Sequence, residues 1–233
     1  MKRCVAALAL LAVGAVAQAP LQGNVTVRHL AASNTGNAGV VVWLTADDGS
    51  NALVAPLPAF RMAQKDKRFA PHLLVVPVGA TVAFPNFDPF FHNVFSLGDA
   101  RPFDLGLYQA GGSRAQMFSR PGVSYVFCNL HPQMSAVIVT VPSRWYAVSD
   151  ASGAYRIPAA PPGAYHLHVW YEHAHAAELA QLEQAVEIKP GAALPALEVQ
   201  EIAAAAAHKN KYGKDYDTAK GYGPGGGAPP MVK

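Results

Sequence analysis

The sequence predicts an all-β protein made of two β sandwiches. Only 14% of its 233 residues are charged, and 20 glycines and 19 prolines are spread along the chain. Short runs of β-branched and aromatic residues stand between these turn residues, a pattern typical of short strands rather than long helices. Because a chain of this length has room for two small domains, we expect two sandwiches with separate cores.

Residues 1–19 have the pattern of a secretory signal peptide. Lys2 and Arg3 precede an apolar run from Val5 to Val16, and small residues follow it. The run is shorter than the roughly 20 residues that a membrane-spanning helix needs, and no later segment reaches that length, so no membrane span is predicted. We expect cleavage after Ala17 and a mature protein that is periplasmic or secreted.

The charge balance argues against nucleic acid as a partner. The chain has 18 Lys and Arg against 15 Asp and Glu, and the predicted signal removes Lys2 and Arg3. The mature protein is then almost neutral and has no cluster of basic residues in sequence. Nucleic-acid binding needs a basic patch that neutralises phosphates, so we exclude it.

The predicted strands fall into three stretches of the chain, residues 20–60, 61–142 and 143–202. A connecting stretch runs from Pro56 through Phe60 to the charged residues 65–68, and we interpret it as a linker or an edge. Residues 174–184 favour a loop or one short helix, and residues 203–233, rich in Ala, Gly and Pro, predict a flexible C-terminal tail. The expected strands are 25–28, 40–44, 73–76, 81–84, 93–96, 124–128, 136–141, 155–157, 165–171, 185–188 and 197–202.

Cys128 is the only cysteine left after signal cleavage. A lone thiol cannot form an internal disulfide, and an exposed one would be oxidised in a secreted protein. Two interpretations remain, an inert buried cysteine and a metal ligand.

The neighbours of Cys128 favour the metal ligand. Cys128, His131 and Met134 follow one another at intervals of three residues, and His92 lies upstream after an aromatic turn. Two imidazoles, one thiolate and a distant thioether are the ligands of type 1 copper, whereas zinc has no use for a thioether. The sequence therefore predicts one copper ion bound by His92, Cys128, His131 and Met134.

The segment from Leu73 to Val141 resembles the cupredoxins, the family of plastocyanin and amicyanin. The short loop from Cys128 to Met134, with two residues in each gap, is similar to that of amicyanin. The resemblance implies a Greek-key sandwich in residues 61–142 with copper at one end and one-electron transfer as its activity. It also implies that Asn93 ties the two ligand loops together.

The remainder of the chain resembles the carboxypeptidase-regulatory-like domain that accompanies a cupredoxin in bacterial methylamine-utilisation-type proteins. The resemblance rests on the turn and strand pattern of residues 150–157 and 161–165, and on opening strands in residues 23–44. It implies a prealbumin-like sandwich formed by residues 143–202, with residues 20–60 either as its first part or as a separate segment. Whether residues 61–142 are inserted in it or precede it is left open.

A second histidine group, His166, His168, His173 and His175, suggests either another metal site or a solvent-facing patch; the lack of further ligands favours the patch.

The type 1 set leaves no open coordination position, so we do not expect an enzyme. The sequence thus predicts an electron carrier with an unidentified protein redox partner. The alternative is a copper-binding module for storage, delivery or sensing.

Overall fold

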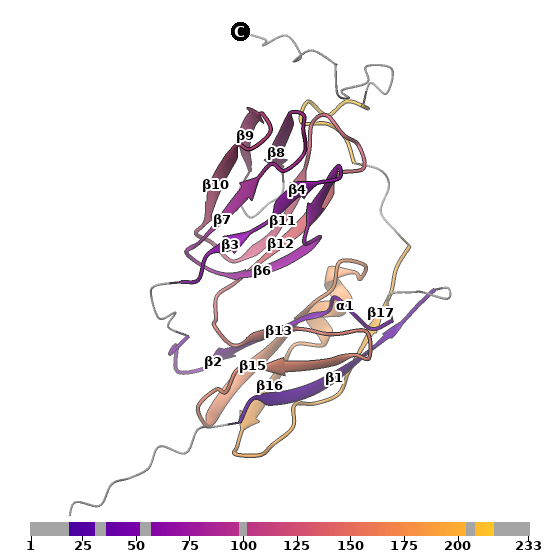
Figure 1. Cartoon of the computed structure of the whole chain (residues 1–233). Helices are drawn as coiled ribbons and strands as arrows, with labels where there is room; N and C mark the ends of the chain where they lie inside the picture. The colour runs from indigo at the N-terminus through magenta and orange to yellow at the C-terminus, as the bar shows by residue number, and fades with distance from the viewer. Residues whose placement is uncertain (1–18, 31–35, 52–56, 98–101, 204–207, 217–233) are drawn as a thin grey trace, which may run out of the picture.

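The computed structural model describes residues 19–30, 36–51, 57–97, 102–203 and 208–216. Residues 1–18 of the predicted signal lie outside this part. The described chain is nearly all β, as predicted, and forms two sandwiches, one above the other in Figure 1. No helix in the described ranges is long and apolar enough to cross a membrane.

The lower sandwich, here called the terminal sandwich, combines strands from both ends of the chain (Figure 1). One of its sheets has the order β14-β1-β17 and the other β13-β2-β15-β16. Its elements are β1 (Leu21–Arg28), β2 (Val41–Ala46), β13 (Tyr146–Val148), β14 (Ala154–Ile157), β15 (Gly163–Trp170), α1 (Ala176–Gln181), β16 (Gln184–Ile188) and β17 (Leu197–Gln200).

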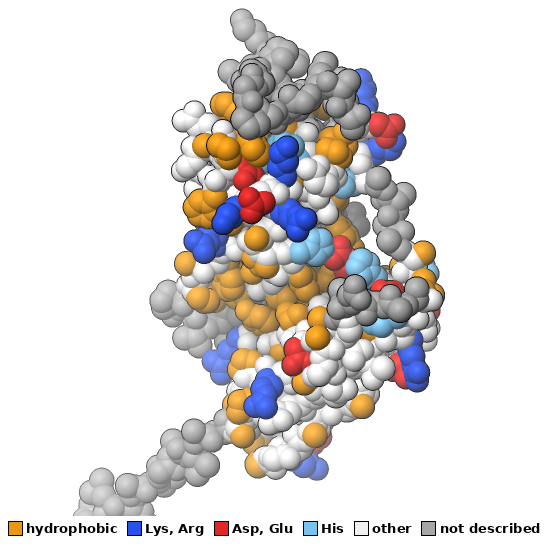
Figure 2. Space-filling view, turned by 45° about the vertical axis from the view of Figure 1, so that its right-hand side comes forward, with side chains coloured by type: hydrophobic (Ala, Val, Ile, Leu, Met, Phe, Trp, Pro, Cys, Tyr) orange, Lys and Arg blue, Asp and Glu red, His pale blue; other side chains and the backbone are white. Residues whose placement is uncertain are grey.

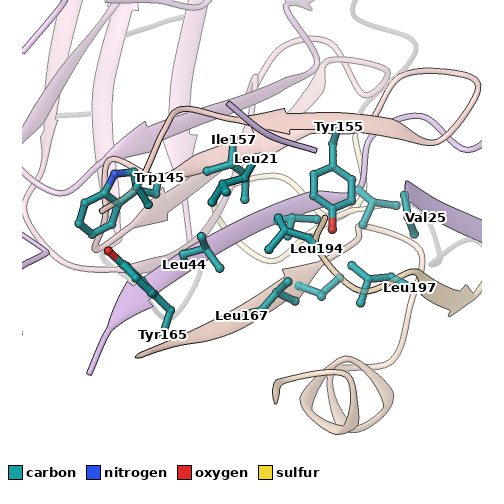
Figure 3. Packing of buried hydrophobic residues seen from close by; sticks show 14 of the residues in the cluster. Leu21, Val25, Leu44, Trp145, Tyr155, Ile157, Tyr165, Leu167, Leu194 and Leu197 are labelled. Carbon is teal, nitrogen blue, oxygen red and sulfur yellow. The ribbon is translucent and has the colours of Figure 1, made fainter. Parts of the chain in front are cut away.

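Alternating side chains build the core of the terminal sandwich. Along β15, Tyr165, Leu167 and Val169 are buried, and the residues between them face outward. They pack with Leu44 of β2 and Ile157 of β14, as Figure 3 shows for several members of this cluster. Strand β1 joins β14 and β17 in one sheet. Its first half pairs antiparallel with β14, and its second half pairs parallel with β17.

The upper sandwich, here called the central sandwich, contains the strands between residues 60 and 141 (Figure 1). Its sheets have the orders β10-β7-β3 and β6-β12-β11-β8-β9, and β4 and β5 form a hairpin beside them. Its strands are β3 (Phe60–Arg61), β4 (Ala63–Lys65), β5 (Arg68–Ala70), β6 (Leu73–Pro77), β7 (Ala80–Pro85), β8 (His92–Ser96), β9 (Phe103–Tyr108), β10 (Ser113–Phe118), β11 (Gly122–Phe127) and β12 (Ser135–Val141).

Strand β12 joins the two sandwiches because both of its faces are buried. Ala136 and Ile138 point into the core of the central sandwich, whereas Val137 and Val139 belong to a separate apolar cluster with Val41 of β2. Figure 2 shows hydrophobic side chains across the middle of the molecule, with histidines beside them. The two sandwiches therefore meet through an apolar junction between sheets.

The charged stretch that we interpreted as a linker or an edge is instead a tight hairpin. Lys65 of β4 pairs with Arg68 of β5, and the two residues between them turn the chain. Asp66 and Lys67 have φ values of 55° and 53°, the left-handed conformation that a two-residue hairpin turn requires. Neither residue is the glycine or asparagine that usually marks such a turn, which explains why the pattern was missed.

Candidate metal centre

Three of the four predicted ligands converge at one end of the central sandwich. The Sγ atom of Cys128 lies 3.7 Å from Nδ1 of His92 and 3.6 Å from Nδ1 of His131. All three ligand atoms lie within 4.8 Å of one another. In the part of the chain that the structure describes, this is the one group of three His, Cys, Asp or Glu side chains placed to share a metal ion.

The loop between β11 and β12 presents its ligands because it closes on itself. The N–H of Cys128 donates to the carbonyl of Met134 at 3.2 Å, and the N–H of Met134 donates to the carbonyl of His131 at 3.0 Å. The N–H of Leu130 points at the Cys128 sulfur at 3.5 Å. Met134 is fully buried in the same apolar cluster as Cys128, so its thioether lies in the core at this end of the sandwich.

Burial dominates the electrostatics of Cys128. It raises the pKa of the thiol, because a thiolate without a partner is poorly stabilised in an apolar core. The backbone N–H groups of Asn93, Leu130 and His131 act in the opposite direction, since they point positive charge at the sulfur. A bound cation would complete this compensation, and metal binding would release the thiol proton.

His92 is held by a carboxylate that the sequence analysis did not assign. Nε2 of His92 lies 2.7 Å from Oδ2 of Asp88. The same carboxylate accepts two backbone N–H groups, that of Asp66 on Oδ1 at 2.6 Å and that of Lys67 on Oδ2 at 3.0 Å. Burial alone would raise the pKa of Asp88, but these hydrogen bonds outweigh it and lower the pKa. The tight β4–β5 turn thus supplies two donors that keep Asp88 ionised.

The Asp88 contact also fixes which nitrogen of His92 can bind a metal. Burial lowers the pKa of His92 and is only partly offset by Asp88, so the ring is neutral at neutral pH. A neutral imidazole whose Nε2–H donates to a carboxylate has its lone pair on Nδ1, the atom that faces Cys128. The spacing of four residues between Asp88 and His92 was the available signal for this role.

Aromatic side chains surround the two imidazoles. The Phe90 ring lies 5.2 Å from that of His92 and 5.5 Å from that of His131, and the two imidazoles lie 4.9 Å apart, centroid to centroid. Of the two ligands, His92 is 0% exposed and His131 is 5% exposed. Phe87 and Phe91, which directly precede Asp88 and His92 in sequence, are exposed. His131 is therefore the ligand nearer to solvent, and the half-buried Phe90 ring packs beside it.

Asn93 contacts the site in a way that the resemblance did not imply. Its side-chain amide donates to Oδ1 of Asp104 at 2.7 Å and to the carbonyl of Gly106 at 3.0 Å, both on β9. Its backbone N–H faces the Cys128 sulfur. The contact between the two ligand segments thus comes from the main chain of Asn93, while its side chain connects β8 to β9.

The second histidine group is spread over the surface of the terminal sandwich. His166 lies 2.7 Å from Asp47, and His168 lies 3.0 Å from Glu183. The ring of His168 also stacks on Trp43. These imidazoles have separate partners, and the described residues bring no three of them together at a common point.

A scan against protein-family models and a search of curated proteins found no match. Solved structures do match, although the TM-scores are low. A copper-containing nitrite reductase from Thermus scotoductus SA-01 is 26% identical over 40% of this chain and 24% of that chain, with a TM-score of 0.35. This protein therefore spans about a quarter of the reductase.

Two smaller proteins match over a similar part of the chain. A purple cupredoxin from Nitrosopumilus maritimus is 21% identical over 35% of this chain and 99% of that chain, with a TM-score of 0.32. A copper(I) form of an amicyanin variant is 20% identical over 36% of this chain and 82% of that chain, with a TM-score of 0.34. The solved structures that resemble this chain thus include cupredoxins, at low identity and partial coverage.

The donor set fits copper on the chemistry of the side chains. Two imidazole nitrogens and one sulfur converge in a buried, apolar setting, and a buried methionine completes the loop. Soft sulfur ligands combined with imidazoles suit copper in both of its common oxidation states. The sulfur and the two imidazoles can each provide a lone pair in their deprotonated forms, so metal binding would displace the thiol proton.

Proposed function

We propose that this protein is an electron carrier that holds one type 1 copper ion through His92, Cys128, His131 and Met134. The observation that carries the proposal is the convergence of the Cys128 sulfur and the two Nδ1 atoms within 4.8 Å in a buried site. The copper ion would supply a reversible one-electron couple. Because four donors would surround it, the site has no position for a substrate, and we propose no catalytic activity.

The protein would hold the ligands in place while the copper ion gains or loses an electron. Asp88 fixes the His92 ring, and three backbone N–H groups face the Cys128 sulfur. The rigid strands β8, β11 and β12 hold both ligand segments. Ligands fixed in this way need little rearrangement when an electron arrives or leaves, which favours fast transfer.

The partner would be a redox protein that docks over His131. Phe90, whose half-buried ring packs beside His131, and Pro132, its neighbour in sequence, would offer an apolar surface for brief contact. A small apolar patch suits transient binding better than a permanent interface. The predicted signal in residues 1–19 places this exchange in the periplasm or outside the cell.

We further propose that the terminal sandwich is a carboxypeptidase-regulatory-like domain made from residues 20–60 and 143–202, with the cupredoxin, residues 61–142, inserted in it. The proposal is supported by β1, which pairs with β14 and β17, and by β2, which pairs with β13 and β15. A protein with residues 61–142 replaced by a short linker tests it: a cooperative unfolding transition is expected, and an unfolded chain would contradict the proposal.

Cyclic voltammetry of the copper-loaded protein tests electron transfer, combined with the rate at which a copper(I) chelator removes the metal. An electron carrier should give a reversible one-electron wave and retain copper for hours. The alternative, a module for copper storage, delivery or sensing, predicts rapid loss of metal to the chelator and a slow or irreversible wave. That result would replace the electron-carrier proposal with the alternative.

A further inference from the structure

A short segment near the C-terminus, residues 208–216, lies against the metal loop. We call it the strap. It belongs to the stretch 203–233 that the sequence predicts to be a flexible tail, yet it packs against the end of the central sandwich, where Figure 1 shows it in yellow. The proposed electron transfer has not used this segment.

The strap contacts three consecutive residues at the start of the metal loop. The ring of His208 stacks on Phe127 at 4.1 Å. The hydroxyl of Tyr216 donates to the carbonyl of Cys128 at 2.8 Å, and the N–H of Lys211 donates to the side chain of Asn129 at 3.0 Å. The hydrogen bonds within the loop use the N–H and the sulfur of Cys128, so the Tyr216 hydroxyl binds the remaining polar group of this ligand.

The strap also reaches the other ligand segment, through Asp104. The ammonium of Lys211 lies 2.7 Å from Oδ2 of Asp104, and Oδ1 of the same carboxylate accepts the side-chain amide of Asn93 at 2.7 Å. Asn93 follows the ligand His92 directly. One nine-residue segment is thus bonded to the loop that carries Cys128 and, through one carboxylate, to the segment that carries His92.

The parts of the strap also support one another. The Tyr216 oxygen lies 3.2 Å from Nδ1 of His208, and the two rings meet edge to face. Lys209 and Asp215 form an ion pair at 2.5 Å. These contacts join the two ends of the strap, so the Tyr216 hydroxyl is presented to Cys128 by a closed turn rather than by a lone side chain.

We propose that the strap holds the metal loop closed from outside and that Tyr216 is the positioning residue for the thiolate ligand. This role of the strap rests on the proposed copper site. Tyr216 touches the backbone of Cys128 and acts on the metal through that backbone. Its hydroxyl limits the opening of the loop, which would keep the thiol covered without metal and would hold the sulfur in place when copper is bound.

The reaction of Cys128 with a disulfide reagent in the metal-free protein tests this role, because the buried thiol can react only when the loop opens. The full chain carries Cys4→Ser, so that Cys128 is its only thiol. Tyr216→Phe removes the hydroxyl and keeps the ring, and the expected rate rises about five-fold, the factor that corresponds to roughly 1 kcal/mol for one hydrogen bond. Tyr125→Phe, an exposed position on β11, is the matched control and should react at the wild-type rate.

Measurements at low urea concentrations separate local opening from global unfolding. A local opening of the loop exposes little surface, so the faster rate of Tyr216→Phe should be nearly independent of urea. In the copper(II) form, the same variant should shift the sulfur-to-copper absorption band, which Tyr125→Phe should not. Equal thiol reaction rates in wild type and Tyr216→Phe, or a rate increase that follows global unfolding, would overturn the inference.

The two proposals can fail separately. A faster thiol reaction in Tyr216→Phe, together with no copper binding in the wild type or the variant, would contradict the copper function. It would still support the proposal that the strap restricts opening of the loop. Tight copper binding combined with unchanged thiol reactivity and an unchanged absorption band would leave the copper function standing and overturn the role of Tyr216.

Discussion

The two sandwiches use histidine in opposite ways. In the central sandwich, His92 and His131 are buried, and their Nδ1 atoms face one sulfur. In the terminal sandwich, His166 and His168 lie along one face of β15, each beside its own carboxylate. Both groups stand out in the sequence, but only the first is gathered at one point.

The difference follows from the backbone that carries each group. Alternate residues of a strand share a face but are separated by almost 7 Å along it, so neighbouring imidazoles find different partners. A loop that closes on itself brings residues three apart to one place, and a second strand adds the remaining ligand. Convergence, rather than the number of histidines, therefore distinguishes a metal centre from a polar surface.

Replacing one histidine of each group should give the largest contrast. His92→Gln removes a buried imidazole ligand, and we expect copper affinity to fall by more than the 10–100-fold that changes around a ligand typically cause. His168→Gln should bind copper as the wild type does. Competition with a copper chelator measures both, and similar losses in the two variants would contradict the distinction.

A cavity in the terminal sandwich should destabilise the protein without altering the metal site. Leu167 is fully buried there, and Leu167→Ala should lower the free energy of unfolding by about 2–5 kcal/mol. Urea denaturation measures this loss. Since Cys128 and Met134 belong to the other core, the copper spectrum of the variant should be unchanged. A shifted spectrum would mean that the apolar junction couples the two sandwiches.

The carboxylates beside the two histidine groups offer a third contrast. Asp88→Asn weakens the hydrogen bond that orients His92, and copper affinity should fall by about 10–100-fold. Asp47→Asn changes the partner of the exposed His166 and serves as the matched control, with no expected effect on copper. Equal copper affinities in the two variants would show that Asp88 does not support the ligand.

The smallest expected effect is a pH dependence at His72, near the junction. A hydrogen bond with Glu172 at 2.8 Å raises the pKa of His72 above its ordinary value of 6.5. A raised pKa in the folded state adds stability that is present below pH 6.5 and is lost as the pH rises through the folded-state pKa. Because half of the His72 side chain is exposed, this contribution should stay below about 1 kcal/mol.

A titration of the His72 ring by NMR measures this pKa directly. Glu172→Gln removes the charge and most of the effect, so the pKa of His72 in this variant should return toward 6.5. The same pKa in both proteins would show that the ion pair does not form in solution.

Much of the architecture could be predicted from local sequence patterns. Runs of β-branched and aromatic residues between turn residues indicated β1, β14 and β15, and the spacing of Cys128, His131 and Met134 indicated a shared loop. The strands β3, β4, β5, β9, β10 and β13 were missed: β3, β4, β5 and β13 are only two or three residues long, and β9 and β10 contain no β-branched residue.

The contacts around the ligands were harder to predict, because they join residues far apart in sequence. Tyr216 lies 88 residues after Cys128, and its composition-biased surroundings predict a loose tail. Asp66 reaches Asp88 only because a turn without glycine brings it there. Three of the four proposed ligands follow a local motif, whereas His92 and the groups that position the ligands come together through the complete fold.

The visible and electron-spin-resonance spectra of the copper(II)-loaded protein, recorded beside Cys128→Ser, test whether Cys128 is a ligand of type 1 copper. We expect an intense thiolate-to-copper band in the wild type that disappears in the variant. A colourless protein, or a pale copper site that is the same in both proteins, would contradict the type 1 site and the electron transfer that depends on it.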